Sequence, residues 1–195
     1  MNPRKLTLDQ LIECRNKILA NAQSLLEDAN CLMKAQRYPR AFTLSHLASE
    51  EIAKLAILAD PILRTLYEEP IQWDSFWKNW KKYCKHEAKL VANAISDYWM
   101  LPIHETYGKC PTEYTDRVQI RNGNKNMSLY VSFAEGKFIG PVDVITKEMA
   151  QTEYAEAIKR LEYSVREELN TEVLISKFRK DPSAFQRSKK RKGIV

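Results

Sequence analysis

Four ionisable residues, His46, Glu50, Glu51 and Lys54, lie close together inside an apolar segment with helical periodicity. On a regular helix Glu50 comes four residues after His46 and four before Lys54, so these three side chains can interact along one face. Glu51 lies in the middle of the leucine stripe, four residues from a leucine on either side. A carboxylate buried there needs a hydrogen-bonded or cationic partner, because an unpaired buried charge is very costly.

A second predicted helix, Ser75 to about Met100, offers partners for these carboxylates. His86 and Lys89 lie one turn apart on it, beside an apolar stripe, and we expect them to meet Glu50 and Glu51. Two interpretations of this meeting stay open. It can be a buried salt-bridge cluster that fixes the helix register, or a catalytic or anion-binding site with perturbed ionisation.

The elements that position these residues are mostly helices. Hydrophobic periodicity and capping residues predict four long helices and two shorter ones. Their ranges run from a Thr7 or Asp9 cap to about Ala35, from Pro39 to about Ala59, from Ser75 to about Met100 and from a Thr146 cap to Leu169, with short helices at Ile62–Tyr67 and Thr171–Lys180. The expected fold is therefore mostly α, an up-and-down helical bundle.

A small β-hairpin is expected as an insertion into this bundle at about residues 115–140. Val118 and Ile120 alternate with polar residues, the turn signal Asn122-Gly123 follows, and the alternation resumes from Leu129 to Phe133. A third short strand is expected at Lys137–Ile139. Such an insertion can decorate the bundle or serve as a contact surface.

The net charge of +6 is concentrated at the end of the chain. Eight Lys or Arg residues and one acid lie between Lys177 and Val195, so this stretch carries +7 and the remainder carries −1. We expect one domain, residues 1–176, and a flexible basic tail, residues 177–195. The tail can bind RNA or another polyanion, or simply be a solvated end. The candidate binding residues among its cations are Arg187, Lys189, Lys190, Arg191 and Lys192.

Several classes of protein are disfavoured by composition. With 44% hydrophobic and 29% charged residues the chain has the balance of a soluble globular protein, and no apolar run approaches the roughly 18 residues of a membrane span. The four cysteines lie far apart, which fits reduced thiols in a cytoplasm better than disulfides or a zinc site. Phosphate-binding glycine loops and H-E-x-x-H pairs are absent, so we expect no metal and no cofactor.

The segment Arg37–Lys54, with its closing Glu-Glu-x-x-Lys, resembles the signature of the AbiV family of abortive-infection proteins. The later His-x-x-Lys at His86–Lys89 is similar to that family as well, as is Tyr130–Phe133 followed by a proline and a long helix. The resemblance covers about Leu11 to Leu169. It implies a HEPN-like helical bundle, commonly dimeric, in a bacterial antiphage system.

Many HEPN proteins are metal-independent ribonucleases with an Arg-x(4–6)-His motif, in which the arginine holds the scissile phosphate and the histidine is the general acid or base. Arg40 to His46 is one match. Chance supplies about half a match in a chain of this composition. An offset of six residues also places the two side chains roughly 120° apart on a regular helix. The match is therefore weak support for a nuclease.

Three functions stay open. The favoured one is an abortive-infection protein, a cytoplasmic homodimer that binds a phage-encoded trigger or a host partner and shuts down translation, with the hairpin, the aromatic third helix or the basic tail as contact surface. The second is a ribonuclease toxin of the same fold. The third is a purely structural charged cluster. Candidate catalytic residues are His86, Lys89, Glu50, Glu51, Arg40 and His46, and candidate binding residues are Lys54, Lys82 and the tail cations.

Overall fold

The computed structural model describes residues 4–83, 120–121 and 123–183. The chain is mostly α-helical with one small antiparallel sheet, as the sequence predicted. The order of the bounded elements is α1 (Leu8–Lys34), α2 (Tyr38–Ile52), α3 (Leu55–Leu66), α4 (Trp73–Tyr83), β1 (Ser132–Ala134), β2 (Lys137–Ile139), α8 (Pro141–Val144) and α9 (Lys147–Lys180).

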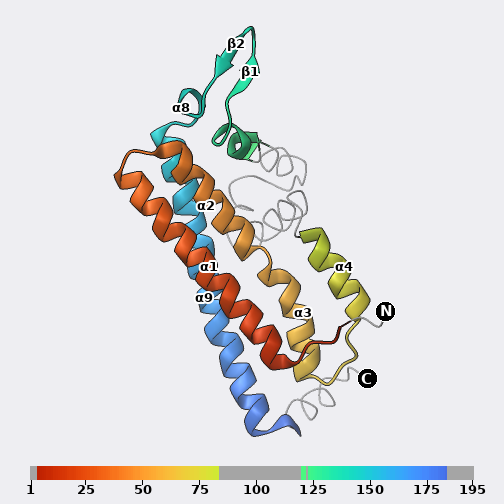
Figure 1. Cartoon of the computed structure of the whole chain (residues 1–195). Coiled ribbons are helices and arrows are strands. Elements are labelled where there is room, and N and C mark those ends of the chain that lie inside the picture. The colour runs from red at the N-terminus through yellow and green to blue at the C-terminus, as the bar shows by residue number, and fades with distance from the viewer. Residues whose placement is uncertain (1–3, 84–119, 122, 184–195) are drawn as a thin grey trace, which may run out of the picture.

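Three helices form the body of the molecule. Figure 1 shows α1, α2 and α9 running side by side, and α2 contacts both of the others. Both long helices begin at a predicted cap. The Thr7 side chain accepts a hydrogen bond from the backbone N–H of Gln10, and Thr146 accepts one from Met149. These caps satisfy backbone donors that the first helical turn leaves unpaired.

The predicted helix from Pro39 to about Ala59 is two helices. It breaks at Ala53–Lys54, where the backbone N–H of Lys54 bonds to the carbonyl of Glu51 in a tighter turn. Pro61, which follows the predicted end of this helix by two residues, lies inside α3. The early break separates Glu50 and Glu51 on α2 from the leucines that follow them.

The C-terminal helix was predicted as two helices and is one. α9 continues from Lys147 to Lys180 without a break near Asn170. The hydroxyl of Thr171 donates to the carbonyl of Glu167, four residues earlier, at 2.9 Å. This bond satisfies the threonine side chain within the helix, so no turn is needed there.

The structure contains a hairpin, but its turn lies later in the sequence than predicted. Residues 123–127 are helical, so Gly123 lies in a helix and not in the expected turn between strands; Asn122 lies outside the described residues. The turn is at Glu135-Gly136, whose φ angles of 52° and 79° are those of a tight hairpin turn. β2 coincides with the predicted third strand, and β1 overlaps the end of the predicted second one. The hairpin projects from one end of the bundle, whereas α3 and α4 lie toward the other (Figure 1).

The apolar core lies in separate clusters along the bundle. The largest joins α1, α3 and α4 with Ile175 of α9, and it includes Leu11, Leu58 and Phe76. A smaller one is made of Leu26, Ala48 and Ala157. Between α2 and α9 the small side chains leave room for polar groups, and the charged cluster lies there.

Candidate functional site: a buried charged cluster on α2

A polar stripe of α2 is buried against α9 and the helical segment 123–127. Thr43, His46 and Glu50 follow one another at spacings of three and four, and each is at most 3% exposed. Thr43 donates to the carbonyl of Pro39, so its hydroxyl is satisfied within the helix, and it also meets the hydroxyl of Ser128 at 2.6 Å. Both α1 and α9 cover α2. One buried face of α2 carries apolar residues, and another carries these polar ones.

His46 lies between two carboxylates. Its Nδ1 is 3.1 Å from Oε1 of Glu153 on α9, and its Nε2 is 3.4 Å from Oε1 of Glu50. The ring stacks on Phe42, with centroids 6.4 Å apart. Nε2 is buried and makes no hydrogen bond of good geometry within the described residues. The histidine is only 1% exposed, so the ring is enclosed by protein.

Cations pair with these carboxylates. Lys125 Nζ lies 3.0 Å from Oε1 of Glu50, and both side chains are almost fully buried. Arg121 bridges two acids of α9, with Nη2 at 2.6 Å from Glu153 and Nη1 at 3.0 Å from Glu156. Lys125 thus pairs with α2, and Arg121 pairs with α9.

Arg160 of α9 closes the cluster on its other side. Its Nη1 donates to the hydroxyl of Ser49 on α2 at 2.9 Å, and its Nη2 lies 3.6 Å from Glu156. The arginine side chain is 1% exposed. With three carboxylates and three cations besides His46, the described members balance in charge, as a buried ionic group requires.

The surrounding cations keep both buried glutamates ionised. Desolvation would raise the pKa of Glu153, but hydrogen bonds and charge from His46 and Arg121 outweigh it and lower the pKa to about 2. Burial opposes ionisation of Glu50 as well, and its contacts with His46 and Lys125 still hold its pKa well below the usual range. The partners therefore dominate over burial at both positions.

The predicted roles of the two adjacent glutamates are reversed. Glu50, expected at the side, is the buried carboxylate, and Glu51, expected inside, lies nearer the surface with its side chain 17% exposed. Glu51 pairs with Lys54 at 2.7 Å, and both line a cleft beside Cys14 of α1. The leucine stripe that suggested burial of Glu51 ends where α2 breaks. The expected pairing of Glu50 with Lys54 therefore does not form, and Lys125 takes that place.

Several predicted site residues are not brought together. Arg40 is exposed at the start of α2, whereas His46 is buried, so the apparent nuclease motif is split between surface and interior. Lys82 lies near the end of α4. His86, Lys89 and the tail cations from Arg187 to Lys192 lie outside the described residues, so their expected roles stay predictions.

Sequence reasoning missed the partners of the cluster on α9 and in the insertion. Glu153, Glu156 and Arg160 follow a helical spacing of three and four, and the small residues Ala157 and Ser164 lie beside them at helical spacing. Charged residues that alternate with small ones on one helix face are a signal for a buried polar interface. Arg121 and Lys125 gave no such signal, because the surrounding pattern favoured a strand.

The charged cluster is better suited to fixing the positions of the helices relative to one another than to catalysing a reaction. A histidine between two carboxylates can hold or pass a proton, but neither the cleft beside Cys14 nor the pocket between α3 and α4 includes a residue of the cluster. No group of three or more metal-ligating side chains occurs within residues 4–83, 120–121 and 123–183. Among the helices of these same ranges, none has the length and apolarity needed to cross a membrane.

Comparisons with known proteins give one family. Searches of curated proteins and of solved structures returned no match. The family model HEPN_AbiV, described as AbiV, matches residues 10–160, which include α2, the hairpin and the cluster residues of α9. This match spans well over half of the chain and agrees with the expected HEPN-like helical fold. The chain belongs to the AbiV family, which associates it with abortive infection, a form of antiphage defence.

Proposed function

We propose that this protein acts in abortive infection by binding a phage-encoded protein, and that the bound state shuts down translation. The observation that carries the proposal is the apolar surface of the hairpin. Five large apolar residues within and beside it are 63–78% exposed, namely Tyr130, Val131, Phe133, Phe138 and Val142. Exposed apolar groups gathered in one place mark interaction sites, because they cost solubility without stabilising the fold.

The hairpin presents these residues in a form suited to a protein partner. Phe133 and Phe138 face each other across the two strands, with ring centroids 5.0 Å apart. The pair stiffens the hairpin while both rings remain open to solvent. Aromatic side chains are enriched where proteins meet, since they bury a large area with few rotatable bonds.

The hairpin itself carries little charge. The neighbouring ionisable residues are Glu135, Lys137 and Asp143, two acids and one cation. Binding to a phosphate backbone depends on several cations acting together. The other exposed cations at this end, Lys34, Arg37, Arg40 and Lys147, lie beside the hairpin and not within it, so the partner should contact the hairpin itself through apolar groups.

The buried state of His46 supports binding over catalysis. A general base for RNA cleavage must reach the ribose hydroxyl, within about 3 Å or through one water. His46 is 1% exposed and enclosed by Glu50 and Glu153, so a ribose hydroxyl cannot reach it in this conformation. Two further parts of the proposal rest on the family resemblance. They are the shutdown of translation as the outcome and a homodimer as the active form.

Translation after infection tests the proposal. Cells that express the wild-type protein or a Phe133→Ser/Phe138→Ser variant are infected, and incorporation of labelled methionine is followed. We expect the wild type to stop incorporation and the variant to leave it near the level of cells without the protein. Leu169→Ser, at a similarly exposed apolar position on α9, is the matched control and should behave as wild type. Continued arrest by the hairpin variant would contradict the proposal.

A ribonuclease is the second candidate, and the His46–Glu153 hydrogen bond is the feature that favours it. A carboxylate that orients a histidine is the arrangement used by general bases. Purified protein, with and without extract from infected cells, is incubated with RNA beside His46→Gln and His86→Ala variants. Cleavage by the wild type that either substitution abolishes, with the fold intact, would favour this candidate. Intact RNA in all samples would exclude it.

A further inference from the structure

Four exposed cations lie around the turn between α1 and α2, at the end of the bundle from which the hairpin projects (Figure 1). We call them the cationic rim, and they are Lys34, Arg37, Arg40 and Lys147. A small apolar cluster holds this end together, and it includes Met33 of α1, Tyr38 of α2 and Met149 of α9. Each of these three lies within two residues of a member of the rim, so the cations gather around one cluster.

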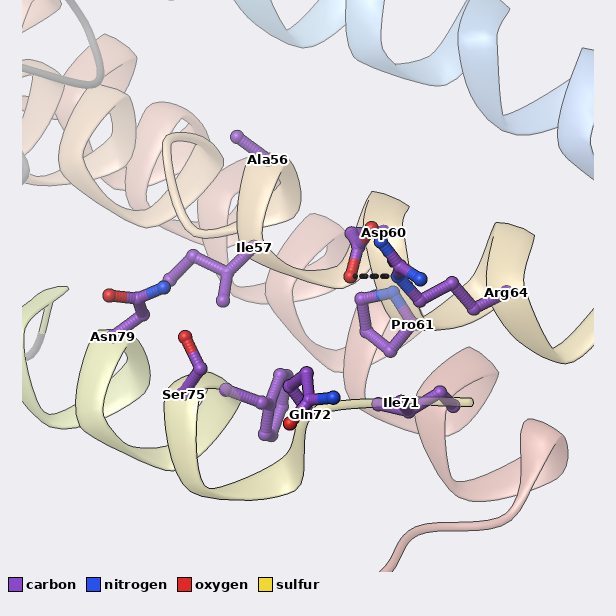
Figure 2. A pocket seen from close by; sticks show the side chains of 10 residues that line it. Ala56, Ile57, Asp60, Pro61, Arg64, Ile71, Gln72, Ser75 and Asn79 are labelled. Atoms are coloured by element: carbon purple, nitrogen blue, oxygen red, sulfur yellow. Dashed lines mark hydrogen bonds and ion pairs between the residues drawn. The ribbon is translucent and has the colours of Figure 1, made fainter. Parts of the chain in front are cut away.

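The cationic rim forms no ion pair with an acid within the part of the chain that the structure describes. From residue 29 to residue 49 the sequence holds three Lys or Arg residues and no Asp or Glu. Lys147 does adjoin Glu148, but that carboxylate accepts a hydrogen bond from its own backbone N–H, which lowers its pKa. Some other surface cations are paired, as Figure 2 shows for Arg64 and Asp60 beside the pocket between α3 and α4. The rim is therefore a local surplus of positive charge.

Two members of the rim lie where a helix disfavours cations. Arg37 is the N-cap residue of α2, its side chain makes no capping hydrogen bond, and the first turn, which contains Arg40, holds no acid. The start of a helix carries a partial positive charge, so acids stabilise it and cations do not. The two arginines therefore strengthen a positive field at some cost to the helix, and an anionic group from outside the chain would offset that cost.

The rim adjoins the exposed apolar surface of the hairpin. α8 links β2 to α9 and contacts α2. Within α8, Val144 packs on the same small cluster as Met33 and Tyr38, whereas Val142 is 78% exposed. Apolar and cationic groups therefore meet at one end of the bundle. Protein interfaces combine an apolar centre with a polar rim in this way. A phosphate backbone is bound through cations, and it would leave the apolar groups of the hairpin uncovered.

We propose that the protein bound by the hairpin is acidic at this surface, so that its carboxylates pair with the cationic rim while its apolar groups cover the hairpin. This inference rests on the proposed function and specifies the chemistry of the partner. Complementary charge speeds association and rejects partners of the same sign more than it adds affinity. The rim therefore selects the partner, and the apolar hairpin holds it.

Capped peptides test the charge preference on the full chain. Acetyl-Asp-Asp-Leu-Phe-Leu-Asp-Asp-amide is titrated into ¹⁵N-labelled protein, beside the same peptide with serine or lysine in place of aspartate. We expect saturable shifts of the backbone amides of Lys34, Arg40 and Phe133, with the acidic peptide binding at least about fivefold more tightly than the serine peptide at low salt. This difference should shrink at about 0.5 M salt, where exposed charges are screened within about 4 Å. Equal binding of the acidic and serine peptides, or tighter binding of a short single-stranded RNA at the rim, would overturn the proposal.

Two matched variants separate the rim from net charge and from the hairpin. Lys34→Glu/Arg37→Glu/Arg40→Glu should weaken binding of the acidic peptide at least about fivefold and abolish translation arrest in infected cells. Its fold should be retained, because acids are favoured at the start of a helix. The control changes the net charge equally at exposed positions outside the rim, Lys78→Glu/Lys81→Glu/Arg166→Glu, and should behave as wild type. If the rim variant still arrests translation while Phe133→Ser/Phe138→Ser does not, the proposed function stands and this inference is overturned.

Discussion

The charged cluster on α2 and the hairpin at the end of the bundle both depart from the usual rule that apolar residues are buried and charged residues are exposed. They depart from it in opposite directions. The cluster places His46, Glu50 and Arg160 in the interior, whereas the hairpin places Phe133 and Phe138 in solvent. The interior charges are paired, so the cluster is compatible with stability. The exposed rings contact each other, but the fold of this chain leaves most of their surface in solvent. A partner should therefore act at the uncovered apolar surface, and not at the unusual interior.

Removal of an acid from the cluster should have the largest effect. Glu153→Ala removes the carboxylate that His46 and Arg121 contact. We expect the free energy of unfolding to fall by about 3–5 kcal/mol. Urea denaturation followed by circular dichroism measures it. Glu162→Ala removes an exposed acid from the same helix and is the control. A loss below about 1 kcal/mol would show that the cluster does not hold the bundle together.

The pH dependence of stability tests the same pairing without removing bulk from the interior. The pKa of Glu153 is lowered on folding, so its contribution is complete above the unfolded value of about 4.3 and is lost as the pH falls toward about 2. The contribution is about 3 kcal/mol. Wild type should therefore lose more stability between about pH 4.5 and 2 than Glu153→Gln, which has no carboxyl to titrate there. Parallel losses in both proteins would contradict the assigned pairing.

The adjacent glutamates provide a comparison within two residues. Glu50→Gln removes the carboxylate charge that pairs with buried Lys125, whereas Glu51→Gln affects a pair nearer the solvent. We expect Glu50→Gln to be the more destabilising of the two by about 2 kcal/mol, since pairs near the surface contribute at most about 1 kcal/mol. Chemical denaturation of both variants under one condition decides it, and the opposite order would restore the arrangement that the leucine stripe predicted.

The hairpin should show the smallest effect on stability. Phe133→Ser/Phe138→Ser removes side chains of residues that are 63% and 78% exposed, so the free energy of unfolding should change by no more than about 0.5 kcal/mol. The same denaturation experiment measures this. A large destabilisation would mean that the rings support the bundle, and the proposed division between interior and hairpin would fail.

Local signals in the sequence predicted much of the fold. The caps at Thr7 and Thr146 and the proline at the start of α2 act within one helical turn, and the structure confirms all three. The hairpin turn was misplaced because Asn122-Gly123 is a strong turn signal by itself. Pairing of Lys125 with Glu50, 75 residues earlier in the chain, comes from tertiary packing that local propensity does not contain.

The site was predicted only in part for a related reason. A helical wheel assumes one buried face, and α2 has two, with α1 and α9 on different sides. Under that assumption Glu51 belonged to the core and Glu50 to its edge. The family signature identified the right segment, but which glutamate is buried depends on the break at Ala53–Lys54 and on the partners from α9.

Phage plating on cells that express matched variants separates the roles of the cluster and the hairpin most directly. His46→Gln changes the cluster and Phe133→Ser/Phe138→Ser changes the hairpin, and both are compared at a temperature where circular dichroism shows them folded. We predict that the hairpin variant loses protection against phage, whereas His46→Gln retains it. Protection retained by the hairpin variant and lost by folded His46→Gln would contradict the proposed function and place it in the charged cluster.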